Sequence, residues 1–234
     1  MQLVCFVTVL LLGVSGTAAA FGNIRLPILG GQKFPATGQV LCYGATFTTI
    51  PCAGTGHDGE IQAGATLSFR DNSNGTITDR NTKLVWEKKS DDGSIHDQDH
   101  RYLWDEAFAV HVHTLNNICS NNEGIACSVN ADCAGVGGKC GCAGKRDWRL
   151  PNVKELQSFV NYGNAPALPA EFNTNCVAGA TVLTGSCTAF FSYYWSSTSH
   201  VTFPWALAIE SFEGTVGYVQ KDQEVRARAV RGGL

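Results

Sequence analysis

Alternation of apolar and polar residues marks much of the second half of the chain as β-structure. Side chains of a strand point to opposite faces in turn, so a period of two predicts a half-buried strand. Such runs occupy residues 194–198, 205–209, 215–220 and 225–231. Earlier in the chain, residues 68–71 and 76–79 flank Asn74-Gly75, and a further short strand is predicted at 84–87. The Asn-Gly pair predicts a hairpin closed by a type I′ turn.

Two helices interrupt this pattern. Within residues 104–115, Trp104, Phe108, Val112 and Leu115 recur at the spacing of one helical face. A second helix is predicted to begin after Asn152, because Glu155 three residues later completes a capping box. The order of elements predicts an α+β fold with a mostly antiparallel sheet and two helices.

The N-terminus has the pattern of a cleavable export signal over residues 1–20. The apolar run 3–14 is too short to span a bilayer, and Ala18 and Ala20 provide the A-x-A cleavage pattern. The two residues before the run carry no positive charge, so a retained anchor or a buried helix is the alternative. No later segment approaches eighteen apolar residues, so no membrane span is expected after cleavage.

The low charge content of the chain argues against nucleic acid as a partner. Only 16% of the residues are charged and the net charge is −3, whereas nucleic-acid binding depends on a basic face that neutralises phosphates. Abundant glycine, 26 residues in all, instead suits short strands joined by turns.

Nine of the ten cysteines lie beyond the signal, in three groups. Cys42 and Cys52 bracket one loop, and Cys176 and Cys187 bracket another. The remaining five form a dense cluster within residues 119–142, which reads as an insertion: Cys119, Cys127, Cys133, Cys140 and Cys142. An exported chain favours disulfides, with zinc as the alternative. Because five is odd, four bridges in total would leave one cluster cysteine free or bonded to another chain.

Polar residues at the first hairpin suggest a cation site. The turn and its flanks offer oxygen ligands of the kind Ca²⁺ prefers, from Asp71, Asn72, Asn74 and Asp79. The regular spacing of known calcium loops is missing, so a plain turn is the alternative, and no other cofactor is expected. The loop 91–101, with His96 and Asp97, is a weaker cation candidate that reads more simply as a solvated surface loop.

Several segments together resemble the Lcl C-terminal domain family, the module that ends a collagen-like bacterial adhesin. The similarity covers about residues 67–233. Its pieces are 69–72, 75–79, 84–86, 104–107, 147–152, 154–156, 194–198 and 225–231. The resemblance implies a C-type-lectin-like fold, similar to formylglycine-generating enzymes and retroelement variable proteins. It also implies an exported bacterial module, secreted, periplasmic or on the cell surface, that binds polysaccharides and is not an enzyme.

We expect three parts in the chain: the signal over 1–20, an extended lead-in with a disulfide-closed loop module over 21–66, and the domain that carries the resemblance over 67–234. Two departures stand out: this chain has no collagen-like repeat, and the insertion 119–142 is additional. The family motifs contain four tryptophans that we expect in the core: Trp86, Trp104, Trp148 and Trp195.

Aromatic residues near the C-terminus are the best candidates for a ligand site, because sugars stack on exposed rings. In proteins of similar fold this region carries the ligand surface. With Trp195 inward, strand alternation places Tyr194 outward. The predicted ligand-binding residues are Tyr194, His200, Thr202, Phe203, Trp205, Glu213, Tyr218 and Lys221.

The terminal arginines allow two interpretations. Arg226, Arg228 and Arg231 could form a basic stripe for sulfated ligands, since guanidinium groups pair with oxyanions. Structural pairing with carboxylates explains them equally well, because Arg231 falls on the opposite face from the other two.

The sequence contains none of the common hydrolase, zinc-protease or phosphate-loop motifs. His111 and His113 lie two apart on a helix and so face different ways. We therefore expect a non-enzymatic module that binds an extracellular polysaccharide or cell-surface ligand, with homo-oligomers possible. The alternatives are a self-assembling extracellular protein and an oxidoreductase of the formylglycine-generating type.

Overall fold

A computed structural model describes residues 34–46 and 48–233. The predicted signal, residues 1–20, lies outside the described residues. The described chain is α+β, with mostly antiparallel strands and few helices, as the sequence pattern predicted.

A four-stranded antiparallel sheet has the order β11-β5-β4-β3. Its strands are β3 (Phe69–Asp71), β4 (Thr76–Asp79), β5 (Leu84–Glu87) and β11 (Val230–Gly232). The hairpin between β3 and β4 is confirmed, but its predicted type I′ turn is wrong. Positive φ occurs at Ser73 and Gly75 rather than at Asn74. The Asn72 N–H donates to the Thr76 carbonyl, so the turn contains three residues instead of two.

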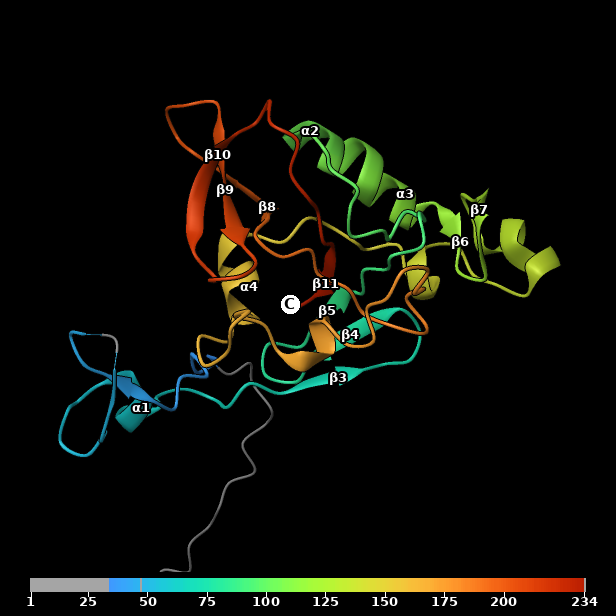
Figure 1. Ribbon diagram of the computed structural model, residues 1–234. Helices are drawn as coiled ribbons and strands as arrows, with labels where there is room; N and C mark the ends of the chain where they lie inside the picture. The colour runs from blue at the N-terminus through green and yellow to red at the C-terminus, as the bar shows by residue number, and fades with distance from the viewer. Residues whose placement is uncertain (1–33, 47, 234) are drawn as a thin grey trace, which may run out of the picture. The chain divides into compact units, whose positions relative to one another are not determined.

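A second antiparallel sheet has the order β10-β9-β8. It contains β8 (Tyr193–Ser199), β9 (Trp205–Glu210) and β10 (Val216–Gln220), drawn orange to red in Figure 1. Both Tyr194 and Trp195 are buried, so the expectation that Tyr194 faces outward is wrong. The cause is that two different apolar clusters cover β8: Tyr194 packs with Leu156 and Phe172, and Trp195 packs with Ala206 and Ala208.

The C-terminal segment joins the two sheets. Its predicted strand 225–231 is shorter than expected, since only β11 pairs continuously. Before β11, the Trp195 N–H donates to the Arg226 carbonyl, and Tyr102 and Val225 exchange backbone hydrogen bonds. Residues 225–230 are all buried. Even at the start of the edge strand β11, Val230 has a neighbour on each side, because it pairs with Trp86 of β5 and exchanges backbone hydrogen bonds with Arg149.

The first predicted helix is present but irregular. It consists of α2 (Trp104–Glu106), a π-helical stretch η1 (Ala107–Val112) and α3 (His113–Asn116), drawn green in Figure 1. The fully buried side chains are those of Ala107, His111 and Leu115. Of the predicted face, Leu115 is thus fully buried, while Trp104, Phe108 and Val112 are only partly buried. The wider π turn shifts the register of the buried face.

The second helix, α4 (Val153–Ser158), begins as predicted. Asn152 Oδ1 accepts hydrogen bonds from the Lys154 and Glu155 N–H groups at 2.9 and 3.0 Å. Glu155 Oε2 in turn accepts from the Asn152 N–H at 2.8 Å. The capping box therefore fixes where this helix starts.

Shorter elements complete the described chain. The N-terminal module, residues 34–66, contains β1 (Cys42–Tyr43), β2 (Thr49–Ile50) and α1 (Asp58–Ile61). The insertion contains the hairpin β6 (Ile118–Cys119) and β7 (Asn122–Ala126), then η2 (Asn130–Val136) and η3 (Cys142–Gly144). A last turn, η4 (Ala170–Phe172), precedes β8.

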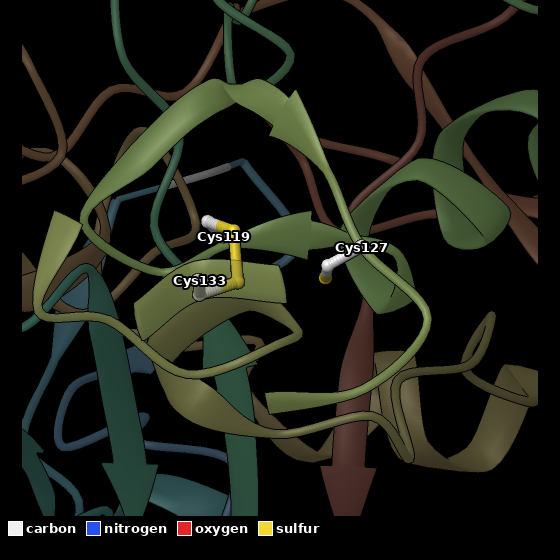
Figure 2. A group of neighbouring side chains, drawn as sticks. All are labelled: Cys119, Cys127 and Cys133. Atoms are coloured by element: carbon white, nitrogen blue, oxygen red, sulfur yellow. A yellow bond between two sulfur atoms is a disulfide. The ribbon is translucent and has the colours of Figure 1, made fainter. Parts of the chain in front are cut away.

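Four disulfides are present in the described residues, as predicted. Cys42 bonds to Cys52, and Cys176 to Cys187. Within the insertion the bridges are Cys119–Cys133 and Cys127–Cys140. Figure 2 shows the Cys119–Cys133 bridge with Cys127 beside it, and the three sulfur atoms lie within 4.8 Å of one another. Because each of these sulfurs is in a bridge, the alternative of a zinc cluster there is not supported.

Among the cysteines of the described residues, Cys142 is unpaired, and it is buried. It belongs to the predicted insertion, as the odd count required. Its side chain packs with Leu115, Trp148 and Ala229 rather than with the bridged cysteines, which form an apolar cluster of their own.

Candidate ligand-binding surface

Four of the predicted residues come together at one end of the β8–β9–β10 sheet. We call His200, Phe203, Trp205 and Tyr218 the aromatic patch. The His200 ring centroid lies 5.1 Å from that of Phe203 and 5.0 Å from that of Tyr218, and Phe203 lies 5.4 Å from Trp205. Phe203 is 54% exposed and Tyr218 is 55% exposed. The patch therefore presents flat apolar rings to solvent.

The loop between β8 and β9 is shaped by His200. Its Nδ1 accepts hydrogen bonds from the Thr202 and Phe203 N–H groups at 3.0 and 3.1 Å. An Nδ1 that accepts leaves the proton on Nε2. His200 thus positions Phe203 next to the Trp205 ring, and the exposed Thr202 lies in the same turn.

A cation lies near the patch. Lys221 Nζ is 3.7 Å from the centroid of the Trp104 ring, within the range of a cation–π interaction. The Trp104 indole N–H donates to the Ser196 carbonyl at 2.9 Å, which fixes the ring against β8. We expected Trp104 in the core, but it is only partly buried, unlike Trp86, Trp148 and Trp195. The helical spacing of Trp104 did not show whether its side chain would be fully or only partly buried.

Two predicted ligand residues lie elsewhere. Tyr194 is 2% exposed, and its hydroxyl accepts a hydrogen bond from the Ala189 N–H, so its ring offers no surface to a ligand. Glu213 is exposed in the turn between β9 and β10. That turn is at the opposite end of β9 from Trp205, since Trp205 pairs with Gln220 and Ile209 with Val216.

The hairpin separates the four predicted calcium ligands into a group of three and one buried residue. Asp71, Asn72 and Asn74 line one open cavity of about 530 Å³, together with Lys145. Asp71 there pairs with Lys88 Nζ at 2.8 Å. Asp79 is buried and accepts hydrogen bonds from Thr82 Oγ1 and the Asn81 N–H at 2.5 and 2.8 Å. The structure therefore brings three of the four together, and calcium binding there stays a prediction.

The loop 91–101 is not the solvated loop we expected. His96 and Asp97 are 2% and 7% exposed. Carboxylate oxygens of Asp91, Asp97 and Asp99 lie within 4.8 Å of one another. Asp97 uses its two oxygens to accept from the Gly93 and Asp99 N–H groups, which closes the loop on itself.

The terminal arginines do not form a basic stripe. Arg231 pairs with Asp147 at 2.7 Å and Arg226 with Asp99 at 3.2 Å. Arg228 is fully buried and donates to the carbonyls of Glu87 and Cys187. The prediction of structural pairing with carboxylates is thus confirmed for Arg226 and Arg231. Arg228 is held by backbone carbonyls instead.

A buried polar network surrounds Glu87, which is 0% exposed. Its carboxylate accepts from His96 Nδ1 at 2.8 Å, His111 Nε2 at 2.9 Å, the Ala229 N–H at 2.8 Å and Lys89 Nζ at 3.2 Å. Although burial raises the pKa of Glu87, attraction to His111 and Lys89 outweighs it and holds the pKa well below its usual range. Glu87 is therefore ionised and acts only as an acceptor.

The pKa values of the two histidines of this network are shifted in opposite directions. Burial lowers the pKa of His111 to about 4, although the charge of Glu87 opposes the change. His111 Nδ1 is buried without a hydrogen-bond partner, so a second ring proton would be an unsatisfied donor. Burial also acts to lower the pKa of His96, but interactions with Cys142, Glu123 and Glu87 raise it well above its usual value. Sequence reasoning missed this network, because its members belong to different elements, a strand, a loop, a helix and the C-terminal segment, and only the fold brings them together.

Comparison with protein families agrees with this architecture. The model of the Lcl C-terminal domain matches residues 75–231, which is more than half of the chain. The chain belongs to the Lcl C-terminal domain family. This confirms the resemblance seen in the sequence, and Lcl C-terminal domains are adhesin-type, non-enzymatic modules. No curated protein matches the chain.

The match with the Lcl C-terminal domain includes the aromatic patch, the Glu87 network and the whole insertion. Within residues 34–46 and 48–233, no helix is long and apolar enough to cross a membrane.

Proposed function

We propose that this protein is an exported, non-enzymatic module that binds an extracellular glycan through the aromatic patch. The observation that carries the proposal is the exposure of Phe203 and Tyr218, which hold their rings in contact with His200 and Trp205. Apolar rings of this size are costly to expose unless a partner covers them.

The chemistry of the patch suits sugars. Pyranose rings present flat C–H faces that pack on aromatic rings, while their hydroxyls need polar partners. The exposed Thr202 hydroxyl lies in the same turn as Phe203, and the Lys221 ammonium, held over Trp104, directly follows the strand β10 that carries Tyr218; both supply such partners. A positive charge at the edge of the patch also favours acidic polysaccharides.

The family and the disulfides support an extracellular location. Lcl C-terminal domains belong to adhesins, and four bridges suit an oxidising compartment such as the periplasm or cell surface of a bacterium. The C-type-lectin-like architecture and the export signal are parts of this proposal. One patch with few polar partners would bind weakly, so adhesion needs several copies presented together.

A glycan array probed with the disulfide-intact chain, in multivalent form, tests the proposal. We expect binding to a subset of polysaccharides, weakened about tenfold, or about 1.4 kcal/mol, by Phe203→Ala and by Tyr218→Ala. Phe191→Ala is the matched control, because Phe191 is also exposed but stacks on Phe212, outside the patch. Silence on the array, or a loss with Phe191→Ala alone, would contradict the proposal.

Self-assembly is the second candidate, favoured by the same exposed rings. It predicts light scattering that rises with protein concentration in the absence of any glycan. Phe203→Ala would reduce that scattering, whereas a glycan-binding patch on a monomer would leave scattering low and unchanged.

A further inference from the structure

The outer edge of β10 has no neighbouring strand within the described residues (Figure 1). β10 pairs with β9 alone, in a regular register without a bulge. On the other side of the same sheet β8 is covered, because the Trp195 N–H donates to the Arg226 carbonyl and the Ser197 N–H to the Pro151 carbonyl. Of the two sides of this sheet, the β10 side is therefore the open edge.

Hydrogen bonds at the two ends of β10 show which of its backbone groups face outward. The Thr215 carbonyl accepts from the last residue of β9, and the Lys221 N–H donates to the loop that precedes β9. Residues of an antiparallel pair bond alternately to one side and to the other, so residues 217 and 219 also bond to β9. The residues whose N–H and C=O groups point to the open edge are therefore Val216, Tyr218 and Gln220.

β10 lacks the features that protect most edge strands from pairing with another chain. Natural edges carry charged residues, a proline or a bulge. β3, an edge strand of the other sheet, follows this rule with the exposed residues Arg70 and Asp71. β10 contains no charged residue and no proline, and its Val216 and Tyr218 side chains are 37% and 55% exposed. Such an edge favours pairing with a further strand.

A second copy of β10 is complementary to this edge. In an antiparallel pair centred on Tyr218, that residue faces its own copy and Val216 faces Gln220 of the second copy, so all the outward backbone groups of the strand meet partners. Moving the centre by one residue places Gln220 opposite the turn before β10. Beyond the strand, Lys221 lies diagonal to the exposed Glu213 of the second copy, so opposite charges approach each other on both sides of the centre.

From these observations we infer that the chain forms a closed homodimer by antiparallel pairing of two β10 strands. The twofold axis is perpendicular to the sheet, so the two copies share one continuous sheet. Trp205 lies directly opposite Gln220, on the same face as Tyr218, so both aromatic patches lie on one face of that sheet. Pairing uses up the open edge, so assembly stops at two copies. The dimer requires no ligand; that it presents two glycan sites together rests on the proposed function.

Size-exclusion chromatography with light scattering tests the dimer, using the disulfide-intact chain without any glycan. We expect the mass of two chains, with no larger species as the concentration rises. Val216→Lys places a charge at the edge, and Val216→Pro removes an outward N–H but no bond to β9. Each should raise the dissociation constant at least tenfold. Val201→Lys is the matched control, because Val201 is 98% exposed in the loop before β9, and it should leave the dimer unchanged.

Disulfide cross-linking tests the register. Residues that face each other as a hydrogen-bonded pair have Cα atoms about 5.5 Å apart, which suits a disulfide. Mild oxidation should therefore link two Tyr218→Cys chains, whereas Gln220→Cys, whose copies lie on opposite sides of the axis, should stay unlinked.

Three outcomes would overturn the inference: a monomer at every concentration, a dimer that both Val216 variants leave intact, or equal cross-linking of Tyr218→Cys and Gln220→Cys. Since none of these measurements includes a glycan, silence on the glycan array would contradict the proposed function and leave the dimer standing.

Discussion

Glu87 is the residue whose loss should cost the most stability. It is fully buried and accepts from two histidines, a lysine and a backbone N–H. Glu87→Gln keeps the shape but removes the charge, leaving Lys89 buried without its counter-ion. We expect the free energy of unfolding to fall by about 3–5 kcal/mol. Guanidinium unfolding at pH 7 measures it, with the exposed Glu213→Gln as control; a change below about 1 kcal/mol would show that the network contributes little.

His111 should make the fold sensitive to acid. Its pKa is lowered from 6.5 to about 4 in the folded chain, so between these values the unfolded chain binds the proton more strongly. The contribution of His111 to stability is therefore complete above pH 6.5 and is lost as the pH falls toward 4, by up to about 1.4 kcal/mol per pH unit.

His111→Gln should flatten that decline, while His113→Gln, an exposed neighbour on the same helix, should keep it. Unfolding midpoints collected between pH 7 and 4 distinguish the two. His96, whose pKa is raised, contributes the opposite trend above pH 6.5, so the slopes are compared below that pH. Equal slopes in all three would mean that His111 does not titrate in this range.

At the scale of elements, α4 shows what local sequence can predict. Asn152→Ala removes the side chain that accepts from the Lys154 and Glu155 N–H groups. The expected loss is about 1 kcal/mol of stability, typical of an N-cap. Lys154→Ala, an exposed change in the same turn, should alter stability by less than about 0.5 kcal/mol. Thermal unfolding of the two variants checks this, and equal losses would show that the cap is dispensable.

Features that depend on residues close together in the sequence were predictable, and features that depend on contacts between separate segments were not. The capping box of α4 and the β3–β4 hairpin depend on residues a few positions apart. The burial of Tyr194 depends on a second apolar cluster that covers the other face of β8, which alternation within one strand does not reveal. His96 read as part of a polar loop because its partners, Glu87 and Cys142, lie in other segments.

The candidate site was predictable to the same extent. Trp205 and Tyr218 lie on adjacent strands and Phe203 lies in the loop just before β9, so their grouping followed from the expected hairpins. Trp104 joined the surface beside them through Lys221, a contact between segments more than a hundred residues apart. Only the folded chain shows contacts of this kind.

At the scale of the whole molecule, the disulfides are local staples with unequal roles. Each closes a short loop, with sequence separations between 10 and 14. The N-terminal module contributes no residue to any of the four apolar clusters. In the Cys176–Cys187 bridge, by contrast, the Cys187 carbonyl accepts a hydrogen bond from Arg228, which is buried in the core. The first bridge should therefore stabilise only its own module, and the second should stabilise the core.

Replacing each pair by alanine tests this difference. The five tryptophans all lie between residues 86 and 205, so their fluorescence follows unfolding of the core and not of the module. We expect Cys176→Ala/Cys187→Ala to lower the free energy of this transition by about 2–4 kcal/mol. Cys42→Ala/Cys52→Ala should leave the transition unchanged within about 0.5 kcal/mol while making residues 34–66 more sensitive to limited proteolysis. If both double variants shift the tryptophan transition equally, the module unfolds together with the core, because a cooperative unit shares the stability of all its bridges.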